Sequence, residues 1–334
     1  MVKVVYSFKP HRLGVELLAR EGFEVSVFRG REPPATWLRA NLRDADAFVV
    51  PPYFRVDRAV LELAPRLKLV GIHGSGTDMV DVGACSDVGV CVFNAPDPVA
   101  ESVAEHALAL TLALLRKVVE GDRAVRSGGW SSGMAPREFL GTTLRGKVVG
   151  IVGLGRVGSA SAKLFRAVGC EVIYWSRRRK PEVEHCLGIR YVGLKELLKS
   201  SDVVVVSVAL TRVTKGLIGK AELSLMKEGS ILVNVSRGGV IDEDSLVEAL
   251  ASGRLGGAGL DVFIEEPLPR DHPLTRLRNV VLTPHIAGYT VESVVNTGLE
   301  VARAIASFFK RGEAPYTALN PEACLKVLGS ECLP

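Results

Sequence analysis

Short runs of apolar, β-branched residues alternate along the chain with stretches in which apolar residues recur every three or four positions. The runs are typical of strands buried on both faces of a parallel sheet, and the stretches between them are typical of helices. In the N-terminal third, the pattern predicts helices at 15–20 and 58–63 and strands at 2–7, 24–28, 47–50, 67–72 and 90–94. This alternation predicts a parallel α/β sheet.

A second series of strand-like runs begins near the middle of the chain. It predicts strands at residues 148–152, 170–175, 203–208, 230–235, 258–263 and 280–282. Pro96 and Pro98 end the first series before a long helical pattern at about 99–120, and a last helix at 291–310 is long enough to return to the first sheet. We therefore predict two doubly wound parallel-sheet domains, one formed by residues 1–98 and 289–334 and the other, residues 99–288, inserted into it.

The second series opens with a glycine-rich turn. Gly153, Gly155 and Gly158 form G-x-G-x-x-G between the strand at 148–152 and a helix predicted at 159–168. In a dinucleotide site the first glycine permits the turn, the second lets a pyrophosphate approach the backbone, and the third lets the helix pack close to its strand. We therefore predict a Rossmann-type cofactor domain here and a flavodoxin-like substrate domain in the first series, with a structural glycine turn as the alternative. The cofactor contacts expected in this turn are Gly153, Leu154, Gly155, Arg156, Val157 and Gly158.

The composition argues against several classes of protein. The formal net charge of +5 is spread along the chain and forms no basic stripe, so we expect no nucleic-acid partner. The most apolar helical stretch, residues 107–115, is too short to span a bilayer, and no secretory leader is recognisable. A soluble, cytoplasmic protein is therefore expected. The chain contains no glutamine and little asparagine, a composition that resembles thermophile proteins.

Six cysteines are present, and they show neither a C-x-x-C pair nor a spacing typical of metal ligands. Buried free thiols are therefore expected, and no metal site is predicted. A disulfide between Cys324 and Cys332 is the alternative that their closeness in the sequence leaves open.

Three ionisable residues directly follow predicted strands of the second series. They are Arg237, Glu266 and His285, which come after the strands at 230–235, 258–263 and 280–282. Because ligands of open α/β sheets bind at the carboxyl ends of the strands, we expect these side chains to meet a ligand. Each alone has a structural explanation, but the joint placement points to chemistry.

The three side chains suit the reduction of a carbonyl group next to a nicotinamide. Arg237 can hold a 2-keto carboxylate through its rigid fork and polarise the ketone. His285 can give a proton to the carbonyl oxygen as hydride reaches the carbon, and Glu266 would favour the imidazolium and fix the ring. In the first series, the small-residue turn at residues 73–78, after the strand at 67–72, offers backbone N–H groups to an anion, with a simple loop as the alternative.

The end of the strand at 170–175 bears on the choice of cofactor. An NAD-specific site places an acidic residue there, and this chain has Ser176, Arg177 and Arg178 instead. A hydroxyl and guanidinium groups can hold a 2′-phosphate by charge-assisted hydrogen bonds. We therefore predict NADP, with NAD as the second choice, and keep a solvated basic turn as the alternative.

These motifs together resemble the D-isomer-specific 2-hydroxyacid dehydrogenases over about residues 45–320. The resemblance is carried by the glycine turn at 153–158 and by the segments 234–238, 259–267 and 283–285. It implies Arg237, Glu266 and His285 as the catalytic set, the N–H groups of Ser75 and Gly76 on the substrate carboxylate, and a homodimer to which residues 99–120 contribute. The further cofactor contacts it implies are Thr211, Val235, Ser236, Asp261 (on the nicotinamide amide), Ile286 and Ala287.

Within this family the chain looks most like the glyoxylate/hydroxypyruvate reductases. Two features depart from the usual pattern: Ile-Ala-Gly-Tyr after His285, and Pro-Pro-Tyr-Phe-Arg at residues 51–55 where substrate contacts are expected. A D-3-phosphoglycerate dehydrogenase is one alternative, although the C-terminal regulatory domain that some of them carry is not recognisable here. A non-catalytic, dinucleotide-sensing protein similar to the C-terminal-binding-protein corepressors is the other.

Overall fold

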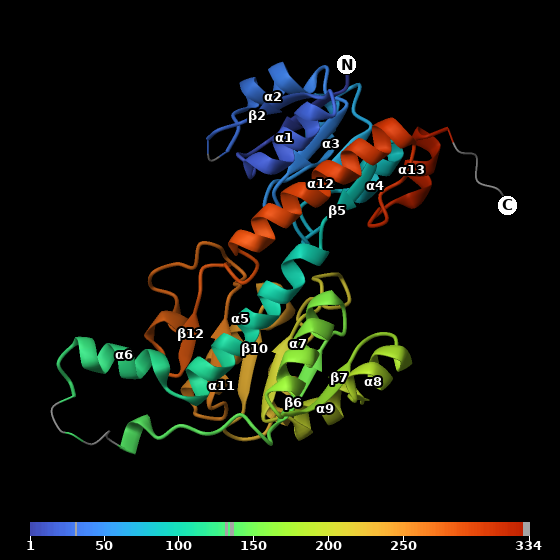
Figure 1. The fold of residues 1–334 in the computed structure, drawn as a ribbon. Helices are drawn as coiled ribbons and strands as arrows, with labels where there is room; N and C mark the ends of the chain where they lie inside the picture. Colours follow the sequence, from blue (N-terminus) through green and yellow to red (C-terminus); the bar gives the residue numbers. More distant parts are fainter. Residues whose placement is uncertain (31, 131–132, 134–136, 330–334) are drawn as a thin grey trace. The chain divides into compact units, whose positions relative to one another are not determined.

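The computed structural model describes residues 1–30, 32–130, 133 and 137–329. The chain folds into two compact units, one made of Met1–Val99 and Tyr289–Pro334, and the other of Ala100–Gly288. Figure 1 colours both along the sequence, so the first unit combines the blue and red ends of the chain. Each unit has its own sheet and its own core.

The first unit is built on a five-stranded parallel sheet in the order β2-β1-β3-β4-β5. This is the flavodoxin-like order of a doubly wound sheet, in which the winding reverses between β1 and β3. Its strands are β1 (Lys3–Tyr6), β2 (Glu24–Val27), β3 (Ala47–Val50), β4 (Leu69–Ile72) and β5 (Cys91–Asn94). Its helices are α1 (Arg12–Arg20), α2 (Ala35–Leu42), α3 (Arg58–Glu62), α4 (Val82–Asp87), α12 (Val291–Arg311) and α13 (Pro321–Val327).

Helices cover both faces of this sheet, because successive residues of a strand point to opposite sides. On β3, Phe48 and Val50 belong to the core under α2, α3 and α4, whereas Ala47 and Val49 belong to the core under α1 and α12. The helices α1 and α12 lie side by side (Figure 1). They are so close that a Cβ atom at Gly14 would lie 2.5 Å from the carbonyl oxygen of Gly298.

The second unit is built on a seven-stranded parallel sheet in the order β12-β11-β10-β9-β6-β7-β8. Its strands are β6 (Val148–Val152), β7 (Glu171–Trp175), β8 (Arg190–Tyr191), β9 (Val203–Val206), β10 (Ile231–Asn234), β11 (Gly257–Leu260) and β12 (Val280–Leu282). Its α-helices are α6 (Val118–Arg126), α7 (Arg156–Ala167), α8 (Pro181–Leu187), α9 (Leu194–Ser200), α10 (Lys220–Leu225) and α11 (Glu243–Ala251). Its short 3-10 helices are η1 (Arg137–Phe139), η2 (Gly238–Val240) and η3 (Pro273–Arg276). The winding reverses between β6 and β9, which is the Rossmann order, so the predicted fold class is confirmed.

The helix α5 (Asp97–Leu115) begins in the first unit and runs into the second. Its buried residues Val103, Ala107 and Leu110 pack with α7 on one face of the sheet, while α9, α10 and α11 cover the other face. The predicted helix at 99–120 is wrong in its bounds, because the backbone of Lys117 adopts the left-handed region at φ 55° and separates α5 from α6.

The length of α5 also corrects an expectation about membranes. The apolar stretch at 107–115 is part of a helix of 19 residues, which by length and composition alone could cross a bilayer. Half of its most apolar window is buried inside the protein. The packing of its buried side chains into the core of the second unit accounts for its apolar composition.

The cysteines differ from the expected set of buried free thiols. Cys91 on β5 and Cys324 on α13 form a disulfide across 233 residues of sequence, and Cys186 is exposed; only Cys85 and Cys170, among the described residues, are buried free thiols. The alternative partner for Cys324, Cys332, lies outside the described residues. The disulfide pairs residues that meet because α13 packs on β5, and such a contact leaves no mark in the local sequence.

Candidate active site

The glycine turn between β6 and α7 has the geometry of an anion site. Gly153 has φ +101°, and a Cβ atom at Gly158 would lie 1.9 Å from the carbonyl oxygen of Gly153, so helix and strand are in contact there. A Cβ atom at Gly155 would meet nothing within 4 Å. No side chain caps the start of α7. The first N–H groups of this helix are therefore open to a negatively charged group, as a pyrophosphate requires. Within the turn, Leu154 is buried, whereas Arg156 is exposed and Val157 is half-buried.

The end of β7 presents two arginines to solvent. Arg177 and Arg178 are exposed, and their side chains make no hydrogen bond or ion pair with other described residues. Arg179 differs, because it donates to both carboxylate oxygens of Glu184 at 2.9 and 2.8 Å. Ser176 is half-buried, and its hydroxyl donates to the carbonyl oxygen of Arg178 within the same turn.

The turn after β10 is folded by an asparagine that the sequence reasoning did not single out. The Asn234 side chain accepts from the N–H and hydroxyl of Ser236, at 3.0 and 2.7 Å, and donates to the carbonyl oxygen of Arg237 at 3.0 Å. Gly238 then passes so close to the next loop that a Cβ atom would lie 2.0 Å from the carbonyl carbon of Phe263. This close approach brings the half-buried Arg237 to the loop that carries Glu266. The neighbouring Val235 is buried, as is Ser236.

Glu266 and His285 form a direct pair. The Oε2 atom of Glu266 lies 2.7 Å from Nδ1 of His285, and its Oε1 atom accepts from the N–H of Phe263 at 3.0 Å. The side chain of His285 is 46% exposed and that of Glu266 is 36% exposed, so the pair stands at the surface of the second unit. With Nδ1 held by the carboxylate, Nε2 is the ring nitrogen left to face a ligand.

The surroundings of Glu266 keep its side chain ionised. Partial burial by itself would raise its pKa, but the hydrogen bonds from His285 and Phe263 and the positive charges of His285 and Arg237 outweigh it and hold the pKa below its ordinary value. A carboxylate that stays ionised can only accept, so Nδ1 of His285 is the donor in this pair. Three strand ends thus bring Arg237, Glu266 and His285 together.

The backbone of His285 is held in an unusual shape by Asp261. His285 has φ +54°, in the left-handed region that residues with a Cβ atom rarely adopt. Its N–H donates to the carbonyl oxygens of Asp261 and Thr283, at 2.9 and 3.0 Å. The Asp261 carboxylate accepts from the N–H groups of Ile286 and Ala287 at 2.9 and 2.8 Å. Asp261 has no exposed surface, so its predicted contact with the nicotinamide amide stays a prediction.

The remaining predicted residues lie in two other turns. Thr211 is exposed, and its hydroxyl lies 3.0 Å from that of Thr214 in a tight turn after β9. In the first unit, Asn94 of β5 donates to the carbonyl oxygen of Ser75 at 3.0 Å and holds the turn after β4. The backbone N–H groups of Ser75 and Gly76 have no hydrogen-bond partner among the described residues.

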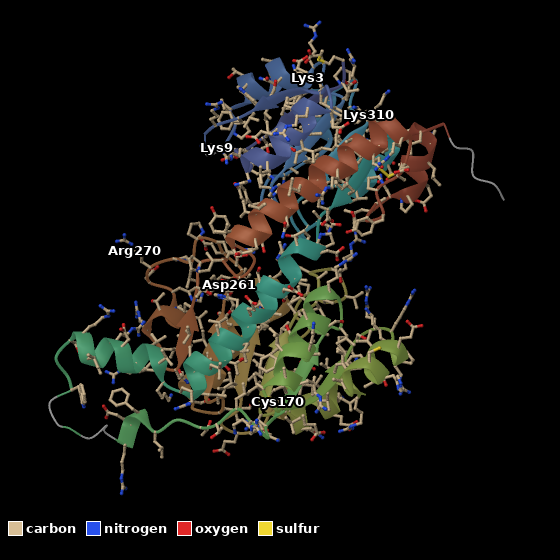
Figure 2. The ribbon with its side chains drawn as sticks, viewed as in Figure 1. Lys3, Lys9, Cys170, Asp261, Arg270 and Lys310 are labelled. Carbon is tan, nitrogen blue, oxygen red and sulfur yellow. A yellow bond between two sulfur atoms is a disulfide. The ribbon has the colours of Figure 1, made fainter. Side chains whose placement is uncertain are left out.

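The sequence reasoning missed a histidine beside this site. His106 on α5 has its Nε2 atom 2.9 Å from Oγ1 of Thr283 and 3.6 Å from Oδ1 of Asp261 (Figure 2 labels Asp261 beside α5). No motif surrounds His106 in the sequence, and Thr283 lies 177 residues away, so nothing local could have linked them.

Known proteins match this chain over most of its length. The family model described as "D-isomer specific 2-hydroxyacid dehydrogenase, NAD binding domain" matches residues 108–287. A glyoxylate reductase of Pyrococcus furiosus is 44% identical over 313 residues, 92% of each chain. A solved protein of Thermus thermophilus is 36% identical, with a TM-score of 0.87 over 95% of this chain and 100% of that one. An NADPH-dependent glyoxylate/hydroxypyruvate reductase of Sinorhizobium meliloti, solved with NADP and malonate, is 31% identical, with a TM-score of 0.83 over 95% and 96% of the two chains.

Fold and site therefore define an oxidoreductase with a domain that binds a nicotinamide dinucleotide. A Rossmann-ordered sheet carries the glycine turn, and an arginine, a glutamate and a histidine meet at the ends of its strands. The chain belongs to the D-isomer-specific 2-hydroxyacid dehydrogenase family.

Proposed function

We propose that this enzyme reduces glyoxylate to glycolate or hydroxypyruvate to D-glycerate, with Arg237, Glu266 and His285 as its catalytic set. The observation that carries the proposal is the 2.7 Å contact between Glu266 and His285, which engages Nδ1 and leaves Nε2 as the ring nitrogen available to a substrate. The name of the Pyrococcus furiosus relative, a glyoxylate reductase, supports the choice of substrate.

The three side chains divide the work of carbonyl reduction. Arg237 binds the 2-keto carboxylate and draws electron density toward the ketone oxygen. His285, as imidazolium, gives the proton on Nε2 to that oxygen and is left neutral. Glu266 stays ionised and keeps Nδ1 as the donor, so the proton that moves is the one on Nε2. When bound, the reduced nicotinamide supplies the hydride that reaches the keto carbon.

The charge of the substrate limits the choice among keto acids. Glyoxylate and hydroxypyruvate each carry a single carboxylate, for which Arg237 suffices, and the N–H groups of Ser75 and Gly76, which have no partner among the described residues, are suited to an anion. Phosphohydroxypyruvate adds a phosphate that needs a further cation. Arg55, which is exposed in the first unit, is the candidate that the sequence offers.

The substrate preference can be measured by cofactor oxidation. We expect kcat/KM to be highest for glyoxylate or hydroxypyruvate, lower for phosphohydroxypyruvate, and lowest for hydroxyacetone, which has no carboxylate. A preference for phosphohydroxypyruvate would overturn the substrate choice in favour of a phosphoglycerate dehydrogenase. A protein that binds the cofactor without turning over any 2-keto acid would instead be the dinucleotide-sensing, corepressor-like alternative.

We also propose NADPH as the preferred cofactor. Arg177 and Arg178 stand exposed and, among the described residues, unpaired at the end of β7, where a 2′-phosphate would lie, and Glu171 stands at the opposite end of that strand. A hydrogen bond to a charged group is worth roughly 1.5–3 kcal/mol. The NADPH dependence of the Sinorhizobium meliloti reductase supports the same choice.

The arginines give this proposal a direct test. The variant Arg177→Ala should raise KM for NADPH by about one to two orders of magnitude and leave KM for NADH nearly unchanged. Arg190→Ala, which removes an exposed arginine from the neighbouring strand β8, is the matched control and should change neither value. Equal losses with both cofactors, or a wild-type enzyme that prefers NADH, would contradict the proposal.

A homodimer and a cytoplasmic location remain predictions. In support of the homodimer, α6 buries none of its residues, and Val118 and Val125 on it are 56% and 59% exposed. Apolar side chains exposed along one helix are typical of a surface that a partner covers. Light scattering at micromolar concentration would distinguish a dimer from a monomer.

A further inference from the structure

We propose that His106 and Thr283 are positioning residues for His285. A chain of hydrogen bonds runs from helix α5 through the Thr283 hydroxyl to the buried Asp261 carboxylate, and it holds the loop in which the imidazole stands. The proposal rests on the assignment of His285 as the proton donor. It adds a residue of α5 whose side chain is linked to the loop of His285 through Thr283 and Asp261.

The loop needs an external support because its conformation is unfavourable in isolation. A residue with a Cβ atom at φ +54° is strained, and such strain persists only where the surroundings determine the backbone. Here the surroundings are the Asp261 carboxylate, which accepts the N–H groups that follow His285, and its carbonyl oxygen, which accepts the N–H of His285 itself. The position of the imidazole therefore depends on the position of the Asp261 side chain.

Thr283 and His106 fix that side chain. The Thr283 hydroxyl donates to Oδ1 of Asp261 at 2.6 Å, which uses its single hydrogen. The 2.9 Å contact between Oγ1 of Thr283 and Nε2 of His106 then requires the imidazole to be the donor. His106 thus carries a proton on Nε2, which also lies 3.6 Å from Oδ1 of Asp261. The imidazole of His106 thus helps to hold the Asp261 carboxylate, which in turn fixes the backbone of the loop that carries His285.

Burial separates this role from catalysis. The side chain of Asp261 is 1% exposed and that of His106 is 20% exposed, so neither stands at the surface as His285 does. A carboxylate that accepts from Thr283, Ile286 and Ala287 has no proton to give. Loss of the Thr283 hydroxyl or of the His106 N–H would free Asp261 to turn, and the imidazole of His285 would move with the loop. A shift of about 1 Å in a reacting group can reduce the rate by roughly a hundredfold.

Paired substitutions test the chain of hydrogen bonds. Thr283→Val and His106→Leu remove a donor, whereas Thr283→Ser and His106→Gln keep one at a similar place. We expect kcat for hydroxypyruvate to fall by about tenfold or more in the first two and to recover in the second two. Thr111→Val is the matched control, because it removes a buried hydroxyl of α5 that binds only the carbonyl oxygen of Ala107 among the described residues; it should leave kcat unchanged.

Combination with His285→Ala shows whether the effect passes through His285. If it does, adding Thr283→Val to His285→Ala leaves the residual kcat unchanged, because the group being positioned is gone. A further loss in the double variant would show a general structural effect and overturn the proposal. So would wild-type kcat in both Thr283→Val and His106→Leu.

A readout without turnover keeps this proposal separate from the proposed function. The nitrogen NMR signal of His285 Nδ1, assigned by its absence in His285→Ala, reports the hydrogen bond to Glu266. It should shift in Thr283→Val and His106→Leu and stay in place in Thr111→Val. An unchanged signal in the first two variants would overturn the positioning role even if the enzyme proved to act on another substrate. Full activity of His285→Ala would overturn the role of His285 in the proposed function, whereas a shifted signal would still show that Thr283 and His106 position its ring.

Discussion

Two histidines follow parallel strands in this protein, one in each unit, and their surroundings differ. His285, after β12, has a half-exposed ring whose Nδ1 atom donates to Glu266 at 2.7 Å. His73, after β4, packs edge-on against Phe8 with ring centroids 5.0 Å apart. Its Nε2 atom is buried and has no hydrogen-bond partner among the described residues. The same position in the fold thus holds one imidazole beside a carboxylate and one in an apolar setting.

The difference shows that a strand end does not by itself make a catalytic residue. Burial lowers the pKa of His73 to about 4, so its ring is neutral near neutral pH and has no proton to donate. In the sequence both histidines follow predicted strands, those at 67–72 and 280–282. What separates them is the set of groups that the fold brings to each ring, which for His285 includes side chains from two other strand ends.

The largest expected effect separates the two histidines by turnover. His285→Ala should lower kcat by about 10²–10⁴-fold, because general acid catalysis contributes about that much, while cofactor affinity changes little. His73→Phe keeps an aromatic ring against Phe8 and should retain most of the wild-type kcat. Steady-state kinetics with hydroxypyruvate measure both, and a reversed order of the two losses would refute the comparison.

Much of the fold was predictable because its signals are local. Buried parallel strands are short β-branched runs, so the strands β6 and β12 were predicted at their observed bounds. The glycine turn was predictable for a similar reason, since Gly153 must adopt a positive φ and Gly158 has no room for a Cβ atom. The strand ends that carry Arg237, Glu266 and His285 follow from the strands themselves.

The parts that could not be predicted depend on contacts between distant residues. The disulfide joins Cys91 to Cys324, and the pairing of His106 with Thr283 joins a helix to a strand end. Cys91, Cys324 and His106 lie in no motif, and the motif at 283–285 gives no sign of the helix that Thr283 contacts. The division between α5 and α6 was missed because the break at Lys117 is a single left-handed residue that is not glycine, and such a residue carries no local signal for that conformation.

A second test compares the two units by the disulfide that one contains and the other lacks among the described residues. The first unit is closed by the Cys91–Cys324 disulfide, and among the described residues the second unit contains only free thiols. Cys324→Ser should lower the free energy of unfolding of the first unit by about 2–4 kcal/mol, mainly because the unfolded chain gains freedom. Urea unfolding with and without reductant measures the loss. The wild type with reductant should match the variant, and a variant as stable as the oxidised wild type would contradict the prediction.

The smallest expected effect is the acid sensitivity that His73 confers. The folded protein protonates this ring, whose pKa is lowered by burial, only below a pH of about 4, whereas the unfolded chain does so below about 6.5. Above the pKa of His73 in the unfolded chain, the neutral ring contributes fully to the free energy of unfolding. This contribution is lost as pH falls from there toward the pKa of His73 in the folded protein, and the loss is at most roughly 3 kcal/mol. His73→Phe has no group to protonate, so its stability should fall less between neutral pH and about pH 5. Urea unfolding at the two pH values measures these losses of stability. Identical losses for the wild type and His73→Phe would exclude this role.

The handedness of the product tests the central claim most directly. If Arg237, Glu266 and His285 act as the catalytic set of a D-isomer-specific enzyme, the wild type should oxidise NADPH in the presence of hydroxypyruvate and form D-glycerate. Chromatography on a chiral phase after complete turnover identifies the isomer. D-glycerate alone is the predicted result. L-glycerate or a racemic mixture would contradict the account, and so would the absence of turnover with both hydroxypyruvate and glyoxylate.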